Sequence, residues 1–180
     1  NKYILCIGRL VADKGITELV HVFTKLQQSN SDLVLILVGE YEEKLDPLPA
    51  EILQEIFINP SIIHINWTGK VEYYMHLAHF FIFPSHREGL PNVLLQAGAM
   101  ELPIICSYIA GNIDIVTNNE TGLMFEKGNE TEMLSLLELA VSQPEQMNKM
   151  AAKLRNDISE NYRRENIWQN MLEAYKSLVN

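Results

Sequence analysis

The sequence predicts an α/β fold, a Rossmann-like doubly wound sheet of six parallel strands with helices on both faces. Short apolar runs alternate with segments of helical period, as in a parallel sheet wrapped by helices. Each run is continuously apolar, which is typical of strands that are buried on both faces. The commonest order for such a sheet, 3-2-1-4-5-6, places the first and fourth strands side by side. The expected strands are Tyr3–Ile7, Leu33–Val38, Ile62–Ile65, Phe80–Phe83, Pro103–Cys106 and Leu123–Phe125.

Helices are predicted between these strands from the spacing of apolar residues. The first follows an i, i+3, i+4, i+7, i+10 pattern, formed by Ile16, Leu19, Val20, Phe23 and Leu26. Further helices are expected at Pro49–Phe57, Val71–His79, Pro91–Met100, Glu130–Val141, Pro144–Ser159 and Arg164–Val179. The last of them carries a wide apolar stripe, which another surface must cover: Ile167, Trp168, Met171, Leu172, Tyr175, Leu178 and Val179.

Size and composition indicate one domain over residues 1–180. The 180 residues are 47% hydrophobic and 21% charged, enough to bury a sizeable core. The net charge of −9 argues against a nucleic-acid partner, because no basic field would gather phosphates. Much of that charge is local, since six acids stand against one lysine between Glu40 and Glu55.

The cellular setting is expected to be cytoplasmic and reducing. Cys6 and Cys106 each lie inside an apolar run, which favours buried thiols over a disulfide or a metal ligand. The longest apolar run, Leu33–Val38, is far shorter than the roughly 20 residues of a membrane-spanning helix. The chain begins at Asn1 with neither a signal peptide nor a basic leader, so we expect a piece of a longer protein.

Polar chemistry gathers in two segments that follow the first and fourth strands. The first, Gly8–Gly15, carries Arg9 and Lys14 around a short loop that opens a helix. Its glycines allow a close backbone approach or a positive φ, so the loop suits a phosphate, although two merely solvated cations are the alternative. The segment is neither a G-x-G-x-x-G fingerprint nor a Walker A loop.

The second segment, Pro84–Asn92, leads into a helix whose free N–H groups favour an anion. A diphosphate would therefore be held from both sides. Glu88, an acid beside this anion site, is expected to bind neutral polyol hydroxyls, with a helix-start carboxylate as the alternative. His86 and Arg87 border the same crevice. Gln96, one turn beyond Asn92, either reaches into it or faces solvent.

A third segment, Trp67–Val71, follows the third strand. The exposed backbone of Gly69, Lys70 and Val71 is expected to hydrogen-bond the edge of a base. His76 and His79 lie three residues apart on a predicted helix, but no third ligand is spaced to complete a metal site, so ordinary helix histidines are expected. Glu40 is a poor candidate for a ribose ligand, because the glycine fingerprint is lacking.

Taken together, these motifs resemble a known family. The strings IGRLVADKG, VGE, WTGKVE, FPSHREGLPNVLLQAGAM and TGLMF are similar to the donor-binding C-terminal domain of family 4 retaining glycosyltransferases of GT-B architecture, also called glycosyl transferases group 1. The resemblance runs through essentially the whole chain. Its most specific parts are Arg9-x4-Lys14 and the PS-x-x-EG-x-P run.

The resemblance implies transfer of a sugar, with retention, from a UDP- or GDP-type nucleotide sugar to an acceptor hydroxyl in polysaccharide, lipopolysaccharide or glycolipid synthesis. No cofactor or metal is expected. Arg9 and Lys14 would neutralise the diphosphate, and Glu88 would hold sugar hydroxyls. The remaining donor contacts would come from Gly8 and from the backbone of Gly89, Leu90, Pro91 and Asn92.

The sequence departs from the family pattern at two places. Gln96 replaces the usual second glutamate, and so gives up the charge-assisted bonds to ribose, which are roughly twice as strong as neutral ones. The run Gly111–Asp114 stands where the family often has Gly-Gly followed by Glu, and is expected only to line the crevice.

The resemblance also implies partners that lie outside this chain. An acceptor glycan or lipid-linked sugar would bind a missing N-terminal domain, toward which the helix at 164–180 would pack, so the piece alone would be inactive. Peripheral association of the full-length protein with the inner face of the membrane stays open. Two alternatives remain: a GT-B-like epimerase or phosphorylase, and a catalytically idle nucleotide-sugar binding module, which Gln96 suggests.

Overall fold

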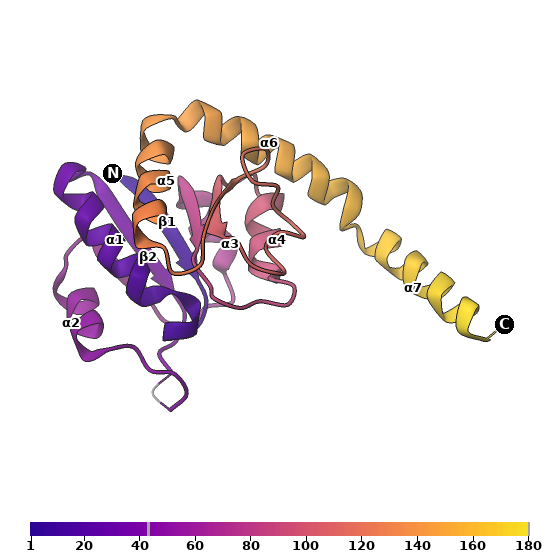
Figure 1. The fold of residues 1–180 in the computed structure, drawn as a ribbon, viewed down its shortest axis with the longest axis horizontal. Coiled ribbons are helices and arrows are strands. Elements are labelled where there is room, and N and C mark those ends of the chain that lie inside the picture. Colours follow the sequence, from indigo (N-terminus) through magenta and orange to yellow (C-terminus); the bar gives the residue numbers. More distant parts are fainter. Residues whose placement is uncertain (43, 180) are drawn as a thin grey trace.

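A single parallel sheet forms the centre of the molecule (Figure 1). The computed structural model describes residues 1–42 and 44–179, with the backbone alone for residues 164, 166, 167, 170 and 179. Over these residues six strands pair in the order β3-β2-β1-β4-β5-β6, which confirms the predicted fold class and strand order. The strands are β1 (Lys2–Ile7), β2 (Leu33–Val38), β3 (Ile62–Ile65), β4 (Phe80–Phe83), β5 (Ile104–Ser107) and β6 (Leu123–Phe125).

Helices cover both faces of this sheet. One core joins it to α1 (Ile16–Ser29), α2 (Ala50–Ile58) and α5 (Glu130–Ser142), and the other joins it to α3 (Val71–Leu77) and α4 (Asn92–Ala99). The long helix α6 (Pro144–Asn161) contributes to both. Figure 1 shows α7 (Arg164–Val179) leading away from the rest of the chain. No helix in the described part of the chain is both long and apolar enough to cross a membrane.

The continuous apolar runs are explained by these two cores. In β2, Leu33, Leu35 and Leu37 pack into the first core, and the intervening Val34, Ile36 and Val38 pack into the second. Successive side chains of a strand point to opposite faces, so a strand covered on both sides is apolar at every position.

Both cysteines are free and buried, as predicted. Cys6 belongs to the first core and Cys106 to the second. Burial raises the pKa of the Cys6 thiol to about 12, and it also raises the pKa of Cys106. Thiols in this state behave as small hydrophobic groups rather than as nucleophiles.

Element boundaries differ from the prediction by a few residues. The helix predicted at Val71–His79 ends at Leu77, because the backbone of His79 already bonds to the sheet, its N–H donating to the carbonyl of Tyr3 at 2.8 Å. Pro91, placed by the prediction in the first helical turn, is the N-cap instead, and α4 begins at Asn92.

The register of β1 and β4 positions the segments singled out from the sequence. Ile4 pairs with Phe80, and Leu5 pairs with Phe81, so the carboxyl ends of both strands reach the same edge. A short 3-10 helix, η1 (Ala12–Lys14), then leads to Gly15, which has a φ of +67°. A Cβ at this position would overlap the carbonyl group of Pro84. The two loops therefore touch backbone to backbone at Gly15.

We expect Gly15→Ala to destabilise the fold by at least about 2 kcal/mol, because alanine is strained at positive φ and would also collide with Pro84. Urea unfolding measures the loss. The control is Gly69→Ala, where the nearest atom to the added Cβ is the tip of Trp67 at 3.8 Å. It should stay within about 0.5 kcal/mol of wild type. Equal stabilities of the two variants would contradict the close contact at Gly15.

Candidate functional site

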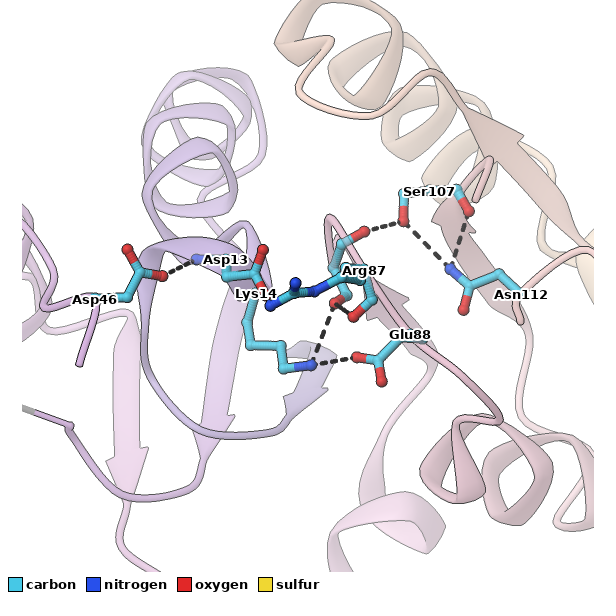
Figure 2. Close-up of polar contacts among 8 residues, drawn as sticks. Asp13, Lys14, Asp46, Arg87, Glu88, Ser107 and Asn112 are labelled. Carbon is cyan, nitrogen blue, oxygen red and sulfur yellow. Dashed lines mark hydrogen bonds and ion pairs between the residues drawn. The ribbon is translucent and has the colours of Figure 1, made fainter. Parts of the chain in front are cut away.

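Lys14 and Glu88 form an ion pair where β1 and β4 end (Figure 2). Lys14 Nζ lies 2.5 Å from Glu88 Oε1, and the two side chains are only 18% and 16% exposed. They line one cavity of about 250 Å³. Gly8, Leu90, Pro91 and Asn92, also predicted as site residues, line the same cavity. The structure therefore brings together residues from both predicted loops.

The N-terminus of α4 opens onto this cavity. Asn92 and Val93, the first two residues of the helix, are among its lining residues, and no side chain caps the helix. The first N–H groups of a helix lack intrahelical partners and carry partial positive charge. Lys14 and α4 thus supply positive potential from two sides, and Glu88 is the acid between them.

A second cavity, of about 220 Å³, adjoins the first at the end of β1. Ile7 and Gly8 line both of them. The second continues over Gly39 and Glu40 to the segment after β3, where Trp67, Thr68 and Val71 line it. Gly69 and Lys70 are exposed and lie outside its lining, and Lys70 Nζ instead lies 5.7 Å from the ring centre of Tyr73. The largely apolar second cavity suits a flat ring.

Arg9 stands apart from Lys14. It is exposed and, within the described residues, forms no ion pair. Arg9 lines the second cavity and a third, more open one of about 730 Å³, but not the cavity of Lys14. The sequence predicted that both cations hold the same group. In the structure they line neighbouring cavities, both of which Gly8 also lines.

His86 and Arg87 line that third cavity. His86 Nε2 lies 3.0 Å from Glu18 Oε1, and a terminal nitrogen of Arg87 lies 3.5 Å from Asp13 Oδ2. Both predicted residues therefore border the site next to Arg9, and they face acids of the neighbouring loop and of α1.

The chain's own contacts hold the two loops together. The carbonyl of Asp13 accepts from the N–H of His86 at 2.9 Å, and Lys14 Nζ donates to Ser85 Oγ at 3.5 Å. The acidic segment joins them, because Asp46 Oδ2 accepts from the N–H of Asp13 at 2.5 Å (Figure 2). Part of the local negative charge noted in the sequence thus supports the loop that bears Lys14.

Gln96 is exposed and lines none of these three cavities. Of the two alternatives left open by the sequence, the structure supports the solvent-facing one. Gly39 borders the second cavity and was not predicted as a site residue from the sequence. It has a φ of +148°, and a Cβ there would overlap the carbonyl of Gly8. Its signal was present in the string VGE, as a glycine directly after a buried strand.

Two of the histidines, His64 and His79, bond to the backbone of neighbouring strands and loops. His79 Nδ1 accepts from the N–H of Tyr3 at 3.2 Å, and His64 Nε2 lies 2.8 Å from the carbonyl oxygen of Gly39. Within residues 1–42 and 44–179, no three His, Cys, Asp or Glu side chains are grouped closely enough to hold a metal ion.

Comparison with known proteins identifies the family. Residues 1–164 match the family Glycosyl transferases group 1. This chain belongs to that family. It is 28% identical over 175 residues to the capsular polysaccharide biosynthesis glycosyltransferase CapM of Staphylococcus aureus, covering 96% of this chain and 45% of CapM. It is 32% identical over 180 residues to an uncharacterized glycosyltransferase of Haemophilus influenzae, covering 99% and 49%. The chain spans about half the length of the curated relatives that it matches.

Solved structures share the fold. HepE of Anabaena, crystallised in complex with UDP-glucose, superposes with a TM-score of 0.87 at 18% identity, covering 98% of this chain and 49% of HepE. The C-terminal domain of LpcC, a glycosyl transferase group 1 family protein of Francisella tularensis, gives 0.81 at 19% identity, covering 91% of this chain and 87% of that domain. The predicted resemblance to a C-terminal GT-B domain is confirmed.

Proposed function

We propose that this chain is the donor-binding domain of a retaining glycosyltransferase that moves a sugar from a nucleotide diphosphate to an acceptor hydroxyl, in polysaccharide, lipopolysaccharide or glycolipid synthesis. One observation carries the proposal: Lys14 and Glu88 meet in a cavity at the N-terminus of α4. Membership of the glycosyl transferases group 1 and the likeness to HepE, which is described with UDP-glucose, support it.

The donor would extend across the two adjoining cavities. Its diphosphate would lie between Lys14 and the N-terminus of α4, its sugar hydroxyls would reach Glu88, and its UDP- or GDP-type base would enter the cavity beside Val71. Gly8, shared by both cavities, has no atom within 4 Å of its Cβ position, which leaves room for a bridging phosphate. Gly89 is open in the same way.

The proposed chemistry follows from the charges around that diphosphate. As the glycosidic bond breaks, negative charge grows on the leaving group, and preorganised positive groups stabilise this change. Lys14 and the N-terminus of α4 would be fixed beside the leaving diphosphate, and Arg9 has a long, exposed side chain in the neighbouring cavity. Together these groups would supply the positive charge without a metal ion. The acceptor hydroxyl would attack from the face that the diphosphate leaves, and this route requires no protein nucleophile.

A second domain is part of the proposal, because the relatives are about twice as long as this chain. It would bind the acceptor glycan or lipid-linked sugar, so the present chain would bind donor but transfer nothing alone. No nucleic acid takes part in this scheme. The full-length protein would act in the cytoplasm, with peripheral membrane association where the acceptor is a lipid.

We further propose that α7 packs on that second domain. Its exposed apolar side chains recur at helical spacing, and they are Trp168, Met171, Leu172, Tyr175 and Leu178, from 50% to 81% exposed. Ile167 and Val179 were predicted as part of the same stripe, but their side chains lie outside the described part of the structure. Asn180 lies wholly outside it.

The phosphate site is tested by Arg9→Ala combined with Lys14→Ala. A charged hydrogen bond from each cation to the diphosphate should contribute at least about 1.5 kcal/mol to the binding free energy. The affinity for UDP or GDP, measured by calorimetry, should therefore fall about 100-fold or more. The fold should persist, because neither residue belongs to the two apolar cores. Lys149→Ala, which removes an exposed cation on α6, is the control. An unchanged affinity of the double variant would refute the site.

The alternatives are separated by turnover of the full-length protein. Turnover of the nucleotide sugar only when an acceptor is present would indicate transfer, and would exclude both the epimerase and the catalytically idle binding module.

Glu88→Gln should change the binding of nucleotide and of sugar nucleotide in opposite directions. The carboxylate pairs with Lys14, so its loss should free Lys14 and raise UDP affinity about fivefold, the equivalent of about 1 kcal/mol for a partly exposed pair. The sugar loses a charge-assisted bond, so the ratio of UDP-sugar to UDP affinity should fall about tenfold. A parallel change in both affinities would place the sugar elsewhere.

The role of α7 is tested by placing Leu172→Asp in two contexts. In the 180-residue chain Leu172 is 53% exposed, so stability should change by less than about 0.5 kcal/mol. In the full-length protein the new charge would be buried against the second domain, so denaturation should show that the free energy of unfolding falls by about 2 kcal/mol. Glu173→Ala, at the adjacent position, is the control. An equal effect in both contexts would disprove the contact.

A further inference from the structure

We infer that Asn112 is a positioning residue, which sets the place of Glu88 through a buried relay of hydrogen bonds over Ser107 and Ser85. The inference rests on the proposed function, since it concerns how the sugar-binding acid is held. In the described part of the chain, the buried polar residues are Ser85, Ser107, Asn112 and Thr121. The first three have no exposed surface, and they are connected.

The direction of this relay follows from the hydrogens available. Asn112 Nδ2 donates to the carbonyl of Ser107 at 2.9 Å and to its Oγ at 3.2 Å. Ser107 Oγ donates to the carbonyl of Ser85 at 2.5 Å (Figure 2). A hydroxyl has a single hydrogen to donate. With that hydrogen given to Ser85, Ser107 Oγ must accept from Asn112, so the relay runs toward the loop after β4.

Ser85 carries the relay to the site. Its carbonyl is held by Ser107, and its own hydroxyl donates to the carbonyl of Arg87 at 3.3 Å. The same hydroxyl accepts from Lys14 Nζ at 3.5 Å. Ser85, the second residue of the loop that bears Glu88, is thus bonded both to Ser107 and to Lys14, the ion-pair partner of Glu88.

The backbone before Asn112 touches the same loop directly. Gly111 has a φ of +84°, and a Cβ there would overlap the carbonyl of Gly89 and lie 3.0 Å from that of Glu88. The turn that carries Asn112 therefore packs against the backbone of Glu88 itself. Moving Asn112 would move both supports of the loop.

Within the described residues only the nitrogen of the Asn112 amide is hydrogen-bonded. Its Oδ1 is buried and has no hydrogen-bond partner within the described residues. An unsatisfied buried polar atom costs folding free energy, which an apolar residue of similar shape would avoid. What Asn112 adds is a fixed direction for the Ser107 hydroxyl, and through it a fixed loop.

The test uses the full-length protein with Asn112→Ala and, as a milder second variant, Ser107→Ala. Calorimetry with UDP and with UDP-sugars gives the ratio of the two affinities. Because Glu88 acts on the sugar, that ratio should fall about tenfold in either variant, while UDP affinity stays within about threefold. In a Glu88→Gln background the same substitutions should have no further effect on the ratio, which is the signature of action through Glu88.

Thr121→Val is the matched control. Thr121 is also buried, at 1% exposed, and its hydroxyl accepts from the N–H of Thr117 at 2.8 Å, away from the site. It should lose stability without changing the ratio. A similar fall in this control, or an unchanged ratio in Asn112→Ala or in Ser107→Ala, would overturn the inference. Failure of the wild-type protein to bind any nucleoside diphosphate would instead refute the proposed function, and the two failures are thereby distinguished.

Discussion

The pairing of β1 with β4 is the constraint on which the site depends. The two strands are far apart in sequence, yet they lie side by side because the chain winds outward to β3 before it returns to the centre of the sheet. If β1 and β4 were not neighbours, other strands of the sheet would separate the two loops that follow them. With Gly15 packed on Pro84, the loops meet so closely that Lys14 and Glu88 bond directly. The electrostatics of the site are thus a product of topology.

This geometry reconciles an acidic protein with an anion site. The net charge of −9 describes the whole surface, whereas binding depends on the potential within a few ångströms. There, a half-buried lysine and a helix N-terminus face the same space. Asp46, from the most acidic stretch, accepts a backbone hydrogen bond from Asp13. Glu43, in the same stretch, lies outside the described residues.

Much of the fold could be predicted, because its signals are local. A run such as Leu33–Val38 can be apolar throughout only when both sides of the strand are covered, and the strand order follows from common winding rules. The gathering of Lys14, Glu88 and Asn92 followed from the same topology. The directions of the side chains could not be predicted from this topology. Whether Arg9 lines the same cavity as Lys14 depends on the path of the loop between them, which ends in η1 and which no periodicity reveals. The run that holds Asn112 was expected to line the crevice, but Asn112 is fully buried and lines none of the three cavities. Its amide bonds to Ser107, and Ser107 in turn bonds to Ser85, a contact between distant parts of the chain that the sequence does not reveal.

The course of α6 has a consequence for how the domain holds together. Its first half contributes Met147 and Met150 to one core, and its second half contributes Leu154 and Ile158 to the other. One helix thus packs into the cores on both sides of the sheet. Detaching α6 would expose apolar side chains in both cores, so this helix links the stability of one layer to that of the other. We therefore expect the two layers to unfold together rather than one at a time.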